Sequence, residues 1–260
     1  MAACMGKVVI MGLIVACIDV VLGFQAMYNL AEAADWQQAT ATWYGSPDGD
    51  GSEGGACGYG SLVKATPFAS RVTAVSPDLF KGGEGCGECY QVKCEENSLC
   101  SDTPVTVVVT DECPGCSSNH FDLSGTAFSG MAVNPAQASG LRNAGVLPIF
   151  YKRVPCEYPG KKVTFHVNEG STDHWFSVLI EYENGDGDLQ EVDLQQNNST
   201  VWEGLKQTWG ANWCLNEGPL KAPFSIRLKS LSSGSTLTAY NVIPQNWQPD
   251  AVYTSIVNYD

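Results

Sequence analysis

The cysteines constrain the fold more than any other residue type. The chain has 11, and eight of them lie between Cys57 and Cys156. A dense cluster in an exported protein is typical of a disulfide framework formed in an oxidising compartment. A zinc site is the alternative, because Cys86-Gly-Glu-Cys89 and Cys113-Pro-Gly-Cys116 are two C-x-x-C pairs with a zinc-ribbon-like separation. The four other cysteines of the cluster favour disulfides.

The N-terminal segment, residues 1–34, predicts export. Lys7 precedes an apolar stretch over residues 8–24, and the Ala-Glu-Ala sequence at residues 31–33 offers a cleavage site, which is the pattern of a secretory signal peptide. A transmembrane anchor is the alternative, but Asp19 interrupts a run that is already shorter than the ~20 apolar residues of a membrane span. We therefore expect a secreted, extracellular protein without a transmembrane anchor.

The acidic balance limits the possible partners. The chain has a formal net charge of −14 at pH 7, and 13 basic and 26 acidic side chains follow residue 34. A field of this sign repels polyanions, so nucleic acid and pectin-like polymers are poor partners, whereas a neutral polysaccharide is not penalised. A secreted protein whose negative charge serves no partner is equally compatible with the composition.

Patterning divides the exported part in two. Residues 35–153 are rich in glycine and cysteine, with short β-prone runs between turn signals, and predict a compact all-β barrel. Residues 154–160 predict a linker. In residues 161–260 apolar and polar residues alternate regularly, as in Phe224-Ser-Ile-Arg-Leu-Lys229, and about 100 residues of such strands predict an immunoglobulin-like β-sandwich.

Three segments point to a known family. A strand-like run at residues 105–110 leads into Asp111-Glu-Cys-Pro-Gly-Cys-Ser-Ser-Asn-His-Phe-Asp122, and upstream lie Thr42-Trp-Tyr-Gly45 and the glycine-rich residues 54–60. Together they resemble the expansins, the plant cell-wall-loosening proteins, and most closely the beta-expansins. The resemblance extends from about Ala39 to Asp260.

The resemblance implies an all-β fold in which a six-stranded double-psi β-barrel, similar to the family-45 endoglucanases, precedes the β-sandwich. It also implies a set of four disulfides that leaves Cys214 unpaired, for which we expect a buried thiol. The implied pairs are Cys57 with Cys86, Cys89 with Cys156, Cys94 with Cys100, and Cys113 with Cys116.

The carboxylates resemble half of a hydrolase site. Hydrolysis of a glycosidic bond normally takes two carboxylates, one as acid and one as nucleophile or base. The His120-Phe-Asp122 element corresponds in the family to the segment that carries the hydrolase acid, so the resemblance gives Asp122 the acid position and places Asp111 in the same groove. If the segment is extended, His120 and Asp122 point to the same side.

The hydrolase base is missing. In the hydrolases it follows a Thr-x-Tyr segment by two residues, but here Thr42-Trp-Tyr44 is followed by Gly45 and Ser46. Asp48, Asp50 and Glu53 are near in sequence, in a glycine-rich region where acidic residues are mostly solvated. We expect Thr42, Trp43 and Tyr44 to line a polysaccharide groove that lacks a catalytic base, so the protein is not expected to be an enzyme.

Tryptophans supply the second expected glycan contact, because flat aromatic faces stack on the apolar faces of sugar rings. Phe176, Val178, Ile180 and Tyr182 share one face of a predicted strand, which we assign to the core. Trp175 then faces outward, and we expect it to form a glycan platform with Trp202, which Trp43 extends onto the first domain. Trp209 and Trp213 are expected in the core.

Function follows from the resemblance. It implies non-hydrolytic loosening of the cell wall by a monomer that binds cellulose and matrix glycans of the xylan or xyloglucan type. A weak family-45-like endoglucanase and a passive carbohydrate-binding module are the alternatives. Overlapping sequons at Asn197 and Asn198 predict one N-glycan. No metal or cofactor motif is present, and none is expected.

Overall fold

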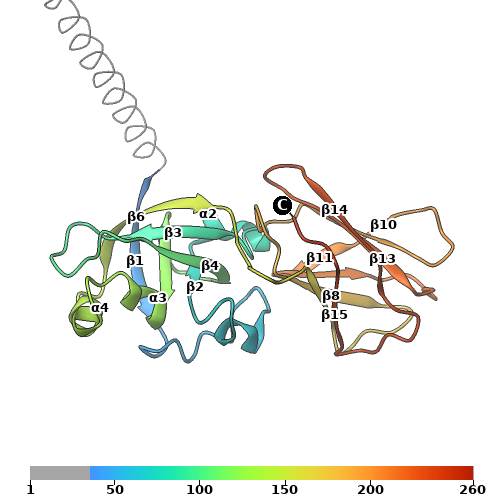
Figure 1. The fold of residues 1–260 in the computed structure, drawn as a ribbon, viewed down its shortest axis with the longest axis horizontal. Helices are drawn as coiled ribbons and strands as arrows, with labels where there is room; N and C mark the ends of the chain where they lie inside the picture. Colours follow the sequence, from blue (N-terminus) through green and yellow to red (C-terminus); the bar gives the residue numbers. More distant parts are fainter. Residues whose placement is uncertain (1–35, 260) are drawn as a thin grey trace, which may run out of the picture. The chain divides into compact units, whose positions relative to one another are not determined.

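The computed structural model describes residues 36–259 (Figure 1). The predicted signal peptide lies outside these residues. Along the described part of the chain, no helix combines the length and apolar character that a membrane crossing requires. From Gln38 onward the chain forms one compact unit, in which a barrel is followed by a sandwich. The all-β class predicted from the sequence is confirmed.

Six strands close the barrel in the order β1-β5-β2-β4-β3-β6. Two neighbouring pairs, β1 with β5 and β2 with β4, are parallel. The strands are β1 (Gln37–Tyr44), β2 (Val72–Val75), β3 (Cys89–Lys93), β4 (Val105–Glu112), β5 (His120–Ser124) and β6 (Leu147–Val154). The short helices between them are η1 (Gly60–Lys64), α2 (Pro77–Phe80), η2 (Lys81–Gly83), α3 (Gly125–Gly130), η3 (Pro135–Gln137) and α4 (Ala138–Arg142).

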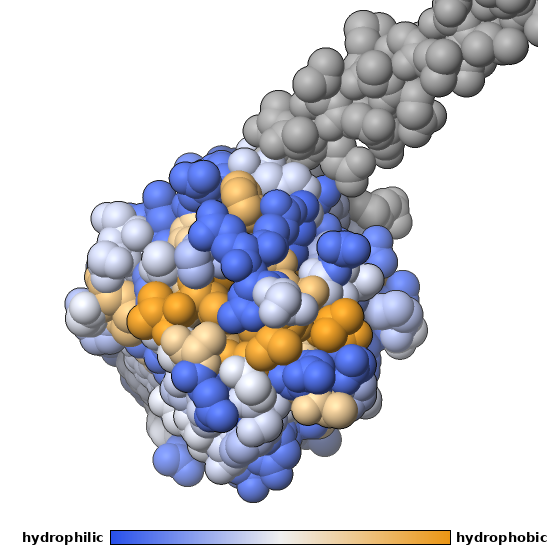
Figure 2. Space-filling view, turned by 90° about the vertical axis from the view of Figure 1, so that its left-hand side faces the viewer, coloured by the Kyte–Doolittle hydropathy of each residue, from blue (hydrophilic) through white to orange (hydrophobic). Residues whose placement is uncertain are grey.

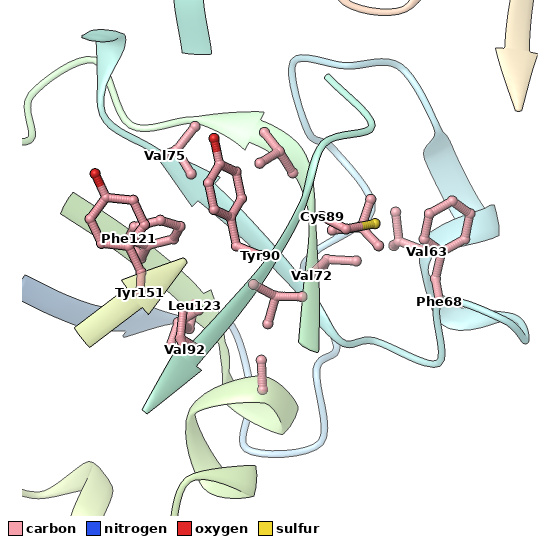
Figure 3. Close-up of a cluster of buried hydrophobic side chains, with 14 of the residues drawn as sticks. Val63, Phe68, Val72, Val75, Cys89, Tyr90, Val92, Phe121, Leu123 and Tyr151 are labelled. Atoms are coloured by element: carbon pink, nitrogen blue, oxygen red, sulfur yellow. The ribbon is translucent and has the colours of Figure 1, made fainter. Parts of the chain in front are cut away.

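Alternation along β5 separates the barrel core from the outer face. Phe121 and Leu123 are fully buried, and the Phe121 ring centroid lies 4.9 Å from that of Tyr151 and 5.4 Å from that of Tyr90. Figure 3 shows these rings gathered inside the barrel. Ser124 ends the strand because its hydroxyl accepts a hydrogen bond from the Ala127 amide and caps α3. Asp122 lies between Phe121 and Leu123, so strand alternation turns it away from the core.

The sandwich contains two sheets, ordered β10-β9-β13-β14 and β11-β12-β8-β7-β15. Phe176 and Phe224 meet between the sheets at 5.3 Å, with Trp247 against both. The strands are β7 (Thr164–Val167), β8 (Phe176–Glu181), β9 (Glu191–Gln195), β10 (Glu203–Gly204), β11 (Lys206–Trp209), β12 (Asn212–Leu215), β13 (Phe224–Lys229), β14 (Thr236–Ile243) and β15 (Val252–Thr254).

All four disulfides implied by the family resemblance are present, and among the described residues Cys214 is the one free cysteine. Its side chain is partly exposed rather than buried as expected. The cysteines at the two C-x-x-C pairs are engaged in disulfides, and no cluster of metal ligands occurs in the part of the chain that the structure describes. The zinc alternative therefore has no support.

The segment 154–160 is packed and is not a free linker. Cys156 is tied to Cys89 and exchanges two backbone hydrogen bonds with Gly185 of the sandwich. Tyr158 is buried, with its ring 5.8 Å from that of Phe68 in the barrel and 5.8 Å from that of Tyr182 in the sandwich. The predicted linker therefore acts as part of the core that joins barrel and sandwich.

Tyr182 is buried in the core as predicted, but it joins the barrel cluster rather than the sandwich cluster of Phe176. Its backbone is left-handed (φ 63°). This conformation ends the alternation after Glu181, so the ring turns toward Phe68 and Tyr158 instead. Arg153 makes a second connection, since it lies 3.1 Å from buried Glu88 of the barrel and 2.8 Å from Asp188 of the sandwich.

Apolar and polar residues are mixed on the barrel end shown in Figure 2, where a band of apolar residues runs between polar ones. Val133 and Val146 are the large apolar side chains of the barrel that are most exposed. Val133 lies between α3 and η3, and Val146 lies between α4 and β6, so both are outside the segments that carry the predicted acids.

Candidate functional site

Strand register brings the predicted acids together. Asp111 of β4 is paired with Ala74 of β2, Ala74 with Asp122 of β5, and Asp122 with Thr42 of β1. The four residues form one row across four adjacent strands, which we call the acidic row. The aspartate Cα atoms are two strand spacings apart, about 10 Å. The residue between them in the row is alanine, and the charges of both carboxylates act on Tyr44.

Hydrogen bonds orient Asp122. Thr42 Oγ1 donates to Asp122 Oδ1 at 2.6 Å, and it lies 2.8 Å from His120 Nε2. Since the threonine proton points to the carboxylate, Nε2–H of His120 donates to Thr42, and Nδ1 accepts from Thr40 Oγ1 at 2.7 Å. Burial lowers the pKa of His120 while the Asp122 charge opposes this. A neutral His120 imidazole fits this chain of hydrogen bonds, in which each donor points toward Asp122.

Tyr44, which lies beside the acidic row, and Asp111, which belongs to it, are also held by their surroundings. Burial, followed by the charges of Asp111 and Asp122, raises the pKa of Tyr44, so its phenol keeps its proton and remains a donor. Asp111 Oδ1 accepts from the amides of Ala56 at 2.7 Å and Glu112 at 2.8 Å. Thr42, Tyr44, Asp111, His120 and Asp122 thus lie close together, and alternation along the strand places His120 and Asp122 on one side of β5.

The glycine-rich segment 54–60 runs from the acidic row to the sandwich. Its Ala56 amide binds Asp111. The Cys57 amide donates to the Thr110 carbonyl, and the Cys57 carbonyl accepts from the Ala211 amide. Gly58 has φ +86°, and a Cβ there would lie 2.8 Å from the ring of Trp209. Only glycine lets this backbone and the tryptophan approach so closely. Segment 54–60 therefore connects Asp111 of the acidic row with the ring of Trp209.

In the region of the missing base, Asp50 and Glu53 are both paired with Lys64, and Asp48 is exposed. Gly45 adopts a left-handed turn (φ +71°), and Ser46 bonds to the Asp50 carbonyl. Glu53 binds the Gly51 amide at 2.8 Å and Lys64 at 3.2 Å. Its own backbone amide and then Lys64 lower the pKa of Glu53, which makes it a weaker base than an unperturbed glutamate.

Trp43 lies on the other side of β1. It packs against the barrel core, its Nε1 donates to the Arg142 carbonyl at 3.1 Å, and the Arg142 guanidinium lies 5.7 Å from its ring. Alternation along β1 explains this position, because Thr42 and Tyr44 face the acidic row and the residue between them cannot. The structure therefore does not bring Trp43 together with the other groove residues.

Trp209 corrects a prediction. Trp213 is buried in the sandwich as expected, but Trp209 is 52% exposed. A register shift after Gln207 and a tight turn at Gly210 (φ +51°) separate the two tryptophans. Although they are four residues apart, they therefore do not lie on one face. The Trp-Gly dipeptide before the second strand of a hairpin was the signal that could have revealed the exposed ring.

Trp175 and Trp202 are half-buried and belong to different sheets. Trp175 precedes β8 of the five-stranded sheet, and Trp202 precedes β10 of the four-stranded sheet. Arg227 covers the Trp202 ring at 4.6 Å and binds Asp193 at 2.8 Å. The two tryptophans therefore do not form the single platform that the sequence suggested.

The barrel with its acidic row and the sandwich that follows define a two-domain polysaccharide-surface protein of the expansin class. Residues 72–151 match the family model described as "Lytic transglycolase", of the double-psi barrel type, and residues 163–244 match the "Expansin C-terminal domain". The chain is 55% identical over 226 residues to Expansin-B3 of Arabidopsis thaliana (86% of this chain, 85% of the relative). It is 56% identical over 229 residues to Expansin-B16 of Oryza sativa subsp. japonica (86% and 84%). This chain belongs to the expansin family and within it to the beta-expansins.

Solved structures agree with the fold. An expansin of Clavibacter michiganensis matches with a TM-score of 0.66 at 22% identity, over 86% of this chain and 98% of that chain. A variant of the same protein in complex with cellohexaose matches with a TM-score of 0.65. At this identity the likeness shows the fold alone. Family membership, which rests on the closer relatives, makes the chain a non-catalytic cell-wall-loosening protein.

Proposed function

We propose that this beta-expansin loosens plant cell walls by binding a glucan chain along the acidic row and onward over Gly58 to Trp209. The register of the acidic row carries this proposal, because it aligns hydrogen-bonding groups from four strands. The 54–60 segment supports it by linking Asp111 to the exposed ring of Trp209. A sugar ring can stack on an aromatic ring with its apolar face and donate hydrogen bonds from its hydroxyls to a carboxylate.

Asp122 has a binding role in this proposal. Its Oδ1 is occupied by Thr42, and its carboxylate offers acceptor capacity to sugar hydroxyls. Hydrolysis would need a second carboxylate to hold a water molecule within hydrogen-bond reach of the scissile bond. Glu53 is held by Lys64 and Gly51, and Asp50 by Lys64. Neither group is arranged as a base, which supports loosening without bond cleavage.

Loosening follows from competition between contacts. A glucan chain in a wall is held by many weak contacts to its neighbours. Binding energy distributed along the acidic row and Trp209 replaces those contacts one after another, and no covalent bond has to break. The polysaccharides we propose as partners are cellulose and neutral matrix glycans, consistent with the net charge of −14.

The proposal is tested by measuring the creep of heat-inactivated walls beside the release of reducing ends. Asp122→Asn keeps the size of the side chain and removes its charge. We expect it to fold and to lose most creep activity. Asp102→Asn is the matched control, since Asp102 is exposed in the loop before β4 and its loss changes the net charge by the same amount.

Each alternative function predicts a different result. An endoglucanase would release reducing ends steadily, and Asp122→Asn would abolish that release. A passive binding module would bind glucan without causing creep. Unchanged creep in folded Asp122→Asn would contradict the role of the acidic row.

A further inference from the structure

A cavity of about 620 Å³ lies beside the proposed glucan path. Residues 58–62 of the barrel form one wall, and strands β7, β8 and β15 of the sandwich form the other. We call it the junction pocket. Its volume falls in the range of sites that hold a small ligand, so it suits one or two sugar units rather than a polymer that continues through it.

Glu181 is the unusual member of the pocket lining. Its side chain is 2% exposed, yet among the described residues no donor binds its Oε1. The nearest basic side chain is that of His166, whose Nδ1 lies 3.8 Å from that oxygen, too far for a hydrogen bond, and whose Nε2 is engaged by Asp250 at 3.2 Å. A buried acceptor without a donor is rare in folded proteins, and a ligand hydroxyl in the pocket would satisfy it.

The remaining lining suits a neutral sugar. Leu179, Val252 and the rings of Tyr59 and Tyr182 supply apolar surface, and the hydroxyls of Thr164 and Thr254 supply polar contacts. The charges are mixed, because Lys161 and Lys162 line the pocket together with Glu181 and His166 pairs with Asp250. The apolar rings and the hydroxyls are the groups that would contact an uncharged sugar, and a comparison with acidic branches tests whether the two lysines attract an anion instead.

Gly58 connects the pocket with the glucan path. It lines the junction pocket and also lies against the ring of Trp209. A chain that stacks on Trp209 therefore passes the pocket entrance. A substituent that leaves such a chain at this point would have a cavity beside it, whereas an unbranched chain would leave the cavity to water.

We propose that the junction pocket receives a neutral branch sugar of the glycan that lies across Gly58 and Trp209, with Glu181 accepting a hydrogen bond from one of its hydroxyls. The proposal rests on the proposed function and deepens it, since it names branched neutral glycans as the preferred substrates. Glu181 is a specificity residue here and has no part in holding the unbranched backbone.

The test compares the affinity of the full exported chain for two oligosaccharides with the same linear glucan backbone. One is unbranched and the other carries single neutral pentose branches. We expect the branched probe to bind about tenfold more tightly to the unsubstituted protein. Glu181→Met removes the acceptor and should abolish this preference, whereas Glu181→Gln keeps an acceptor oxygen and should retain most of it.

Two further variants separate this role from stability. Replacing a buried unpaired acceptor by an apolar side chain of similar shape is near neutral or stabilising, so Glu181→Met should melt at or above the temperature of the unsubstituted protein. Ser61→Trp fills the pocket from its exposed rim and should also remove the preference. Ser98→Trp, at an exposed serine in the β3–β4 loop, should not.

The outcomes distinguish the two proposals. Equal binding of both probes by the unsubstituted protein, or a preference that survives in Glu181→Met and Ser61→Trp, overturns the branch pocket alone. Tighter binding of a probe with acidic branches than of the neutral one also overturns it. Asp122→Asn should weaken both probes alike, and failure of the unsubstituted protein to bind either probe overturns the proposed function together with the pocket.

Discussion

Thr42 on β1 donates a 2.6 Å hydrogen bond to Asp122 on the neighbouring parallel strand β5. The same hydroxyl accepts from His120, so a single side chain fixes both the aspartate and the histidine. Asp122 is therefore held by a hydroxyl chain rather than by a cation. The orientation of Asp122 depends directly on Thr42, and through Thr42 on His120 and Thr40.

Thr42→Val tests this orientation. Valine has nearly the same shape as threonine but neither donates to Asp122 nor accepts from His120, so both groups lose a partner. We expect a loss of stability of about 1–3 kcal/mol and a clear loss of wall creep. Thr40→Val, which breaks only the outer bond to His120, serves as the graded comparison and should cost less creep. Equal activity of Thr42→Val and the unsubstituted protein would argue against the orienting chain.

Trp209 and Trp213 should separate in one pair of experiments. Trp209→Ala removes an exposed ring, so cellulose binding should weaken by about tenfold while thermal unfolding changes little. Trp213→Ala creates a cavity in the sandwich and should cost about 3–5 kcal/mol of stability. Binding isotherms and melting curves on both variants check the assignment. A strongly destabilised Trp209→Ala would contradict it.

Gly58→Ala should disturb the same site through the backbone. Its φ of +86° and the 2.8 Å approach of the Trp209 ring leave no room for a methyl group. We expect Trp209 to be displaced, with weaker cellulose binding and a loss of about 1–3 kcal/mol. Gly54→Ala is the control, because a Cβ there meets nothing within 4 Å and its φ is not in the left-handed region.

Buried glutamates predict that stability depends on pH. Burial, followed by the charge of Asp188, raises the pKa of Glu183 to about 8, and burial raises that of Glu181 to about 7. Both values lie above the ordinary carboxyl pKa of the unfolded chain. The folded state therefore holds protons that the unfolded chain has released.

The contribution of Glu183 to the free energy of unfolding should be largest below pH ~4.3 and should fall by at most ~1.4 kcal/mol per pH unit up to about pH 8. Urea midpoints at pH 5, 7 and 9 check this direction. Glu183→Gln cannot titrate, so its midpoints should vary less with pH. A protein that grows more stable from pH 5 to 9 would contradict the assignment.

The disulfides should differ in weight. Cys89–Cys156 closes a loop of 67 residues, whereas Cys113–Cys116 closes one of three. Chain entropy predicts about 4 kcal/mol for the long loop and about 1–2 kcal/mol for the short one. Paired Cys-to-Ser variants measured by urea unfolding should show this order. The reverse order would mean that native-state packing outweighs the loop effect.

The groove itself was implied by resemblance to relatives, and simple patterns account for the residues that lie on its regular strands. Thr42, His120 and Asp122 obey simple alternation on β1 and β5, and parallel pairing then brings them together. Alternation gives no direction for a side chain where the regular strand ends. The left-handed residue Tyr182 and the register shift before Trp209 each reverse the direction of an aromatic ring, and neither change leaves a periodic signal in the sequence.

The packing of segment 154–160 could not be predicted from its composition. Its proline and glycine content is typical of a flexible connection, but Cys156 and Tyr158 within it are anchored by partners that are remote in sequence. Local composition contains no information about such contacts. The disulfide pairing could be anticipated only through resemblance to relatives, because eight cysteines allow many frameworks.

The packed segment at 154–160 also determines whether the protein or the polysaccharide changes conformation on binding. A connection held by a disulfide, a ring cluster and the Arg153 ion pairs cannot work as a loose tether. The distance between the acidic row and Trp209 is then constant. In the proposed function the polysaccharide, rather than the protein, must change conformation on binding and separate from its neighbours.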